Sequence, residues 1–171
     1  GNGGIREQTF VVNISLLGFT AVSLSRLCLR LLRFHASLRR TIYQANHPEL
    51  VYRGGQGPIV HLECDLHATV AWAGQQGCRW AFTLSNAGAY YFEDRADLAQ
   101  LNEIDWVAVQ AKYWQSCKEG KQAEFLVENR FPWHLVERIG VHSRAVYQQA
   151  VNALPPGGHR PAVEIRPDWY Y

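Results

Sequence analysis

Apolar residues after Tyr43 lie in short runs with strand-like or helical spacing, so the chain is predicted to form short strands mixed with short helices. We expect strands over residues 59–66, 80–83, 123–127 and 162–165, and at the end of 131–141. We expect helices over residues 67–76 and 143–154, a helix entered at 102–106 and reaching Trp114, and a helical turn over 97–100. Because these elements follow no regular βαβ order, the pattern predicts an α+β domain.

The first 41 residues follow a different pattern. Leucines at 24, 27, 31 and 32 recur with a helical period, and arginines at 26, 30 and 33 accompany them, so a basic amphipathic helix for a membrane or an anionic partner is one interpretation. An Arg-rich segment without a specific function is the other. We see no strand alternation that would join this segment to a core.

Composition divides the chain at the same place. Residues 1–41 hold six Arg and one Glu, a balance of +5, whereas the remainder holds eleven Lys and Arg against fourteen Asp and Glu, a balance of −3. All six Trp lie at or after Trp72, and all eight Tyr at or after Tyr43. We therefore predict a separate Arg/Leu-rich segment over 1–41 and a folded domain over 42–171.

Several functional classes find no support in the sequence. The four cysteines are widely spaced, with no zinc-type Cys or His pairing, so we expect reduced thiols and no metal. No apolar run reaches the roughly 18 residues of a membrane span, and the chain has no basic n-region of a signal peptide, which favours a cytoplasmic protein with no membrane partner. Dinucleotide-binding GxGxxG, P-loop and GxSxG motifs are absent.

One acidic residue, Glu124, interrupts the apolar run Ala-Glu-Phe-Leu-Val. Strand alternation would place Ala123, Phe125 and Val127 on one face, and Glu124 with Leu126 on the other. A carboxylate beside a core is costly unless it is paired or used by chemistry. Two interpretations remain open at this point: a half-exposed strand residue that points to water, and a functional carboxylate.

Two aromatic or imidazole features also allow two interpretations. Tyr90, Tyr91 and Phe92 follow a small polar stretch, where aromatic rings can stack on nucleobases, although they suit a core equally well. His61 lies in a predicted strand, and such a histidine is more often packed in a core than catalytic.

Motifs spread over residues 43–171, about three quarters of the chain, resemble the DarT family of DNA ADP-ribosyltransferases, the toxins of DarT–DarG toxin–antitoxin systems. The resemblance is carried by Asn-His-Pro-Glu-Leu at 46–50, Tyr-Arg-Gly-Gly-Gln at 52–56, Pro-Ile-Val-His-Leu at 58–62, Ala-Phe-Thr-Leu-Ser-Asn-Ala at 81–87, Lys-Gln-Ala-Glu-Phe-Leu-Val at 121–127 and the ending Trp-Tyr-Tyr. It implies an ADP-ribosyltransferase fold that splits NAD, the co-substrate, and attaches ADP-ribose to thymine in single-stranded DNA, with a DarG-like macrodomain antitoxin as partner.

The same resemblance implies roles for particular residues. Glu124 matches the catalytic glutamate of the family motif, and a carboxylate there can stabilise an oxocarbenium-like ribose and accept a proton from the attacking base. The implied DNA-binding candidates are Lys121, which can meet a phosphate, and Asn86, Tyr90, Tyr91 and Arg53.

The N-terminal part departs from the family. Its His-Ile-Thr-type NAD motif and its Pro-Arg-Ser-x-Met-Leu-type motif are both missing from residues 1–41, so the NAD-binding residues are unknown and this part of the fold is incomplete. We hypothesise that residues 1–41 derive from a frameshifted or decayed gene. The alternative function is then an inactive remnant that still binds single-stranded DNA or the antitoxin, and a membrane-associating peptide fused to an α+β domain is a third hypothesis.

Overall fold

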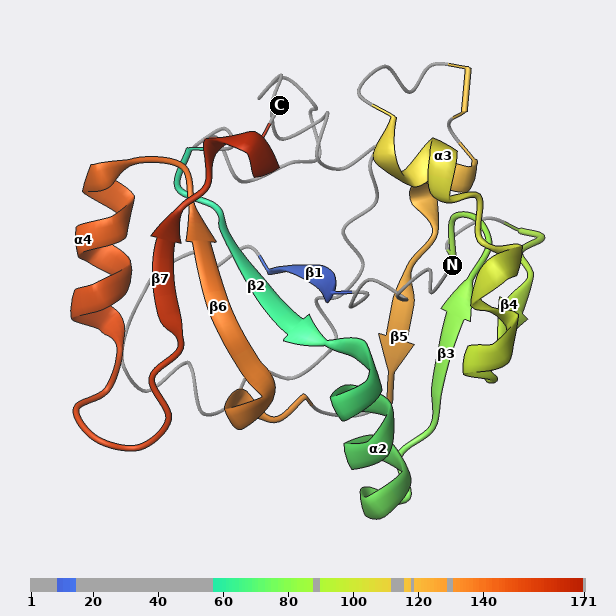
Figure 1. Cartoon of the computed structure of the whole chain (residues 1–171), viewed down its shortest axis with the longest axis horizontal. Helices are drawn as coiled ribbons and strands as arrows, with labels where there is room; N and C mark the ends of the chain where they lie inside the picture. Colours follow the sequence, from blue (N-terminus) through green and yellow to red (C-terminus); the bar gives the residue numbers. More distant parts are fainter. Residues whose placement is uncertain are drawn as a thin grey trace, which may run out of the picture.

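The computed structural model describes residues 9–14, 57–87, 90–111, 116–117, 119–128 and 131–170, which form two sheets flanked by short helices (Figure 1). One sheet has the strand order β1 (Thr9–Ile14), β2 (Val60–Asp65), β6 (Val136–Val141) and β7 (Ala162–Ile165). The other has the order β4 (Asp94–Arg95), β3 (Trp80–Thr83) and β5 (Phe125–Val127). The mixture of short strands and short helices confirms the predicted α+β class.

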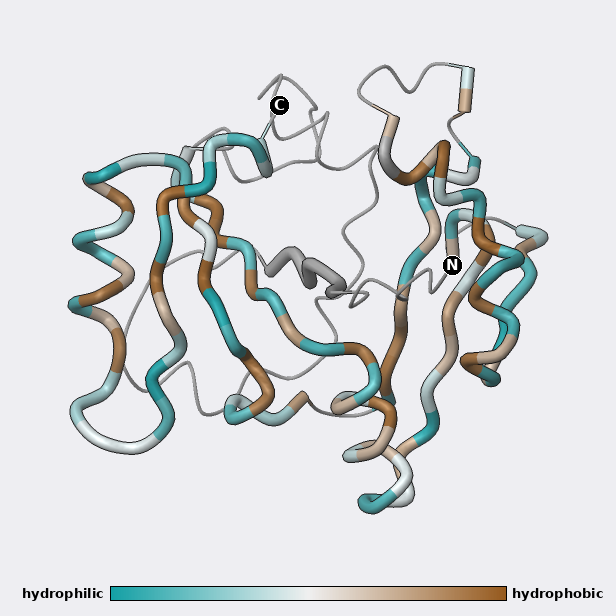
Figure 2. The backbone as a smooth tube through the Cα atoms, viewed as in Figure 1, coloured by the Kyte–Doolittle hydropathy of each residue, from teal (hydrophilic) through white to brown (hydrophobic). Residues whose placement is uncertain are grey.

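A parallel crossover completes the first sheet. Strands β1, β2 and β6 are antiparallel, whereas β6 and β7 are parallel and are joined through α4 (Arg144–Ala153). Ser143 begins α4 because its side chain accepts a hydrogen bond from the Val146 amide, which satisfies one of the free N–H groups of the first turn. The loop between α4 and β7 is hydrophilic to neutral, while hydrophobic positions recur along the strands (Figure 2).

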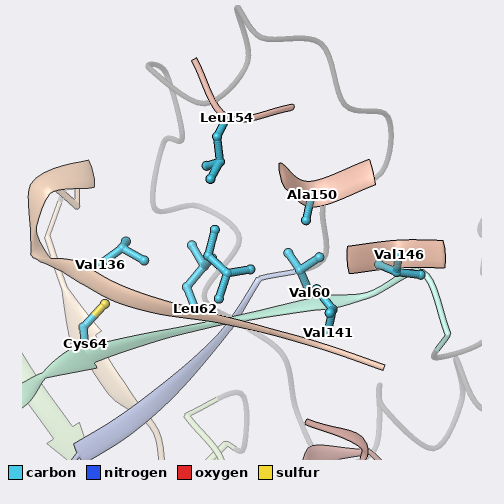
Figure 3. Close-up of a cluster of buried hydrophobic side chains, with 9 residues drawn as sticks. Val60, Leu62, Cys64, Val136, Val141, Val146, Ala150 and Leu154 are labelled. Carbon is cyan, nitrogen blue, oxygen red and sulfur yellow. The ribbon is translucent and has the colours of Figure 1, made fainter. Parts of the chain in front are cut away.

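The first hydrophobic core lies between this sheet and α4. Two side chains of α4 and the residue that follows the helix face residues of β2 and β6 across it (Figure 3): Val146, Ala150 and Leu154 against Val60, Leu62, Val136 and Val141. Alternate residues of β2 contribute to this core, so His61 and Glu63 lie on the opposite face of the sheet. Both are nevertheless buried.

A tight strand-to-helix junction links the two sheets. Asp65 ends β2 and caps α2 (Leu66–Gln76) by accepting the Ala68 amide at 2.7 Å. Gly77 ends α2 with a left-handed backbone, φ 64°, which glycine adopts without steric cost. The chain then enters β3, so the side chains of Leu66 and Phe82 meet in a second core.

That second core lies under short helices. Leu66, Phe82, Leu101 and Ile104 form its centre. The remaining elements are η3 (Leu98–Glu103), α3 (Trp106–Gln110), η4 (Gly120–Gln122), η5 (Trp133–Leu135) and η6 (Pro167–Trp169).

Most predicted elements are confirmed, although several of their bounds differ from the prediction. Strands β3 and β7 have the predicted limits, and α4 lies within its predicted range. The helix expected to reach Trp114 ends at Gln110, because Ala111 has an extended backbone with φ −60° and ψ 131°. The strand expected from Ala123 begins at Phe125, because the Glu124 amide bonds a side chain in place of a strand carbonyl.

The expectation that residues 1–41 lack a strand able to join a core was also wrong for β1. This strand pairs along its whole length with β2, from Thr9 opposite Asp65 to Ile14 opposite Val60. Its sequence, Thr-Phe-Val-Val-Asn-Ile, does not alternate, but it is rich in the β-branched residues that favour strands. The amphipathic helix predicted over residues 24–33 lies outside the described residues.

Candidate active site

Glu124 lies at the edge of β5, where the ladder to β3 ends. Phe82 pairs with Phe125, so Glu124 stands opposite Thr83. The Thr83 amide donates to the Glu124 carbonyl at 2.8 Å. The Glu124 amide in turn donates to the Thr83 hydroxyl at 3.0 Å. Two hydrogen bonds therefore hold the Glu124 backbone to the end of the neighbouring strand.

The Glu124 side chain points away from the second core. Phe82 and Phe125, its neighbours along the ladder, both pack into that core, and successive strand residues alternate between faces. Both carboxylate oxygens of Glu124 are buried nonetheless. A buried carboxylate interacts more strongly with a cationic centre than an exposed one, because water does not screen it. The interpretation that Glu124 is a strand residue pointing to water is therefore wrong.

The segment before Glu124 is anchored to α3. The Lys121 Nζ donates to the Val109 carbonyl at 2.8 Å, where a carbonyl at the end of a short helix needs a donor. Gly120 lies so close to α3 that a Cβ there would come within 2.9 Å of the Ala108 Cβ. The ammonium group of Lys121 thus has a structural role, and its predicted contact with a DNA phosphate stays a prediction.

The loop after β3 carries three of the DNA-binding candidates. The Thr83 hydroxyl donates to the Ser85 carbonyl at 2.6 Å, which places the half-buried Asn86 near the Glu124 backbone. Tyr90 and Tyr91 are 91% and 86% exposed, and their rings meet edge to face with centroids 4.6 Å apart. The core interpretation of these two tyrosines is therefore wrong. The fifth candidate, Arg53, lies outside the described residues.

His61 is packed against the chain end. Its ring lies 4.5 Å from that of Tyr170 and 6.0 Å from that of Trp169, between centroids. The Tyr170 hydroxyl lies 2.5 Å from the Ile59 carbonyl and 3.2 Å from that of Gly140, and burial raises its pKa well above the usual range. These contacts are those of a core histidine. They show that Trp169 and Tyr170 of the C-terminal motif pack against β2 and β6.

A charged network that sequence patterns did not indicate crosses the same face of the sheet. Arg138 of β6 bonds the carboxylate of Glu63 on β2, and also that of Glu164 on β7 at 3.1 Å. The Glu63 side chain is only 7% exposed. Glu63 and Arg138 stand opposite each other in the ladder, so only the strand register could have revealed the pair.

The described residues hold neither a metal-type cluster nor a membrane-type helix. Among them, no group of three or more His, Cys, Asp or Glu could hold a metal ion. None of the helices in the described part of the chain combines the length and the apolar character of a membrane span. Cys64 and Cys78 are free thiols.

Comparison with known proteins identifies the family. The model of the family described as "ssDNA thymidine ADP-ribosyltransferase, DarT" matches residues 37–171. A DNA ADP-ribosyl transferase from Thermus aquaticus is 36% identical over 132 residues, which are 76% of this chain and 58% of that protein. The chain thus spans less than two thirds of the length of this curated relative.

Solved structures agree. The structure of Thermus sp. 2.9 DarT in complex with NAD+ aligns with a TM-score of 0.69 and 36% identity, over 78% of this chain and 67% of that one. The structure of the same protein in complex with ADP-ribosylated single-stranded DNA aligns with a TM-score of 0.69 and 36% identity, over 78% and 63%. The ADP-ribosyltransferase-like fold expected from the sequence motifs is confirmed, and this chain belongs to the DarT family.

Proposed function

We propose that this chain transfers ADP-ribose from NAD, as co-substrate, to thymine bases of single-stranded DNA, with Glu124 as the catalytic carboxylate. The observation that carries the proposal is the family match over residues 37–171, within which Glu124 is held at the ladder end with a buried carboxylate. The relatives support the reaction, since one is a DNA ADP-ribosyl transferase and another is seen with NAD+ and with ADP-ribosylated DNA.

The proposed chemistry uses one carboxylate in two ways. Transfer breaks the bond between ribose C1′ and the nicotinamide nitrogen, nicotinamide leaves, and the ribose acquires oxocarbenium character that a nearby anion stabilises. A bond then forms between C1′ and a thymine ring nitrogen, which becomes a better nucleophile as its proton passes to a base. Glu124 is the proposed anion and the proposed base. The residues that hold NAD stay unassigned.

The exposed aromatic pair supports the proposed DNA substrate. Tyr90 and Tyr91 offer two ring faces beside the loop that Thr83 ties to Glu124, and each stacked base contributes about 1–3 kcal/mol in single-strand binding proteins. Because every base has a π-face, such stacking tolerates sequence variation. We propose that this pair binds bases next to the modified thymine, and that Asn86, Lys121 and Arg53 add polar contacts.

The proposal is tested by mass spectrometry of a single-stranded oligonucleotide incubated with NAD and the protein. A mass gain of one ADP-ribose is expected on a thymine-containing strand and not on a thymine-free strand. Glu124→Gln is expected to abolish the gain, while Glu119→Gln, a matched control at an exposed glutamate, is expected to keep it. A folded wild-type chain that forms no adduct contradicts the proposal, and if it still binds the oligonucleotide, the inactive-remnant alternative is favoured.

Two further proposals rest on family membership. A DarG-like macrodomain antitoxin is the proposed protein partner, which co-purification of the two chains tests. A cytoplasmic location is proposed because the DNA substrate is found there. The frameshift hypothesis for residues 1–41 is tested by reading the DNA upstream of codon 42. If no frame encodes a His-Ile-Thr-type or a Pro-Arg-Ser-x-Met-Leu-type segment, the hypothesis is wrong.

A further inference from the structure

At both ends of the ladder between β3 and β5, a side chain takes the place of a backbone hydrogen-bond acceptor. In a regular antiparallel ladder, the residues of every second opposite pair exchange two backbone hydrogen bonds. At one end, Thr83 donates its amide to the Glu124 carbonyl, but the returning Glu124 amide meets the Thr83 hydroxyl. At the other end, the Glu128 amide donates to the Arg79 carbonyl, and the Arg79 amide meets the Glu128 carboxylate at 3.3 Å. A side chain thus replaces one backbone acceptor at each end.

The two ends differ in burial. Thr83 is completely buried, with 0% of its surface exposed. The Arg79 side chain at the other end is 87% exposed, and its ion pair with Glu128 is open to solvent. Water can replace a lost acceptor at the Arg79 end, but it has no access to Thr83. The hydroxyl is therefore the acceptor on which the Glu124 amide depends.

The same hydroxyl has a second bond that reaches the loop after β3. Its proton is directed at the Ser85 carbonyl, 2.6 Å away, while its lone pair receives the Glu124 amide at 3.0 Å. One oxygen atom therefore joins the backbone before β5 to the turn after β3. The next residue along, Leu84, donates its amide to the Glu93 carbonyl at 3.0 Å, which continues the connection toward the segment after Tyr90 and Tyr91.

From this geometry we infer that Thr83 is a positioning residue, whose hydroxyl sets the backbone at Glu124 and holds the Ser85–Asn86 turn in register with it. The inference rests on the proposed function, because Glu124 is the proposed catalytic carboxylate. A carboxylate that shifts by a fraction of an ångström loses part of its effect on a developing charge. The loss is therefore expected in kcat, and KM for the DNA strand is expected to rise as well, because Thr83 also holds the turn that carries Asn86.

Three variants separate positioning from stability. Thr83→Val has nearly the same shape but no hydroxyl, and is expected to lower kcat by about tenfold or more and to raise KM for the DNA strand. Thr83→Ser restores the hydroxyl and is expected to recover most of kcat. Glu128→Ala removes the corresponding acceptor at the exposed ladder end, and is expected to keep kcat. If Thr83→Val loses no more kcat than Glu128→Ala at equal thermal stability, the inference is overturned.

A second measurement does not depend on activity. Hydrogen exchange by NMR follows the Glu124 amide directly, and in Thr83→Val this amide is expected to exchange at least about tenfold faster, with protection regained in Thr83→Ser. Unchanged exchange in Thr83→Val overturns the inference. If the wild type proves inactive, the proposed function fails, and the exchange measurement still decides whether Thr83 holds the Glu124 backbone.

Discussion

Gly140 gives the sharpest test of how the chain end is packed. This residue of β6 stands opposite His61 of β2, and a Cβ built on it would lie 2.2 Å from both Cε3 and Cζ3 of Trp169. Carbon atoms cannot approach so closely, and an indole ring is rigid. Gly140→Ala therefore displaces Trp169 from the sheet, and disturbs Tyr170, whose hydroxyl lies 3.2 Å from the Gly140 carbonyl.

The size of the effect follows from the contacts that are lost. The Arg166 guanidinium lies 4.5 Å from the Trp169 ring centroid, a cation–π contact of about 0.5–1 kcal/mol at an exposed site. A hydrogen bond of the Tyr170 hydroxyl contributes about 1 kcal/mol. Forcing atoms into a filled site costs about 1–3 kcal/mol more. We expect a loss of about 3 kcal/mol, or about 6–12 °C in Tm for a chain of this size.

Thermal unfolding followed by circular dichroism measures this loss, and two controls define its cause. Gly74→Ala adds a methyl group on α2 where nothing lies within 4 Å, so it is expected to raise stability by up to about 1 kcal/mol. In a Trp169→Ala background, Gly140→Ala is expected to cost less than about 1 kcal/mol, since the clash is gone. An equal cost of Gly140→Ala in both backgrounds would refute the reasoning.

Three further predictions concern single side chains. Lys121→Met removes the donor to the Val109 carbonyl and is expected to lower stability by about 1 kcal/mol in urea unfolding; no change would show that water replaces the ammonium. Arg138→Met leaves the buried Glu63 carboxylate without its cation and is expected to cost about 2–4 kcal/mol, with part regained on adding Glu63→Gln. Burial raises the pKa of the Cys64 thiol to about 12, above its unfolded value, so the free energy of unfolding is expected to be constant with respect to this group below about pH 9 and to fall as pH rises toward 12. Alkylation of folded Cys64 at pH 9 is expected to be negligible. Rapid alkylation without denaturant would contradict this.

Local signals explain which elements the sequence could predict. Ser143 before α4 and Gly77 after α2 mark their helix ends through contacts within a few residues, so the bounds could be read from the chain itself. The strand β1 was missed because pairing with β2 joins residues about 50 positions apart, and its apolar run does not alternate. Alternation of apolar and polar residues indicates a strand with one buried and one exposed face, and it does not indicate strands of other kinds.

In the candidate site, too, local motifs indicated some residues, whereas contacts between distant parts of the chain could not be predicted. Family motifs pointed to Glu124, but the hydrogen bonds that hold its backbone come from Thr83, 41 positions away. The packing of Tyr170 against the Ile59 carbonyl spans 111 positions. Such contacts depend on the final register of strands and leave no periodic trace in the sequence. For Lys121, the motif led us to expect a contact with DNA, whereas in the structure its ammonium group donates to the Val109 carbonyl.

Glu124 is the residue on which the proposed transfer of ADP-ribose to thymine depends most. The most direct measurement is the single-turnover rate of adduct formation on a thymine-containing single strand with saturating NAD, for the wild type and for Glu124→Gln. We predict transfer by the wild type and a rate at least about 100-fold lower for Glu124→Gln, whose thermal stability is unchanged. Equal rates for the two proteins, or no adduct from a folded wild-type chain, would contradict the account.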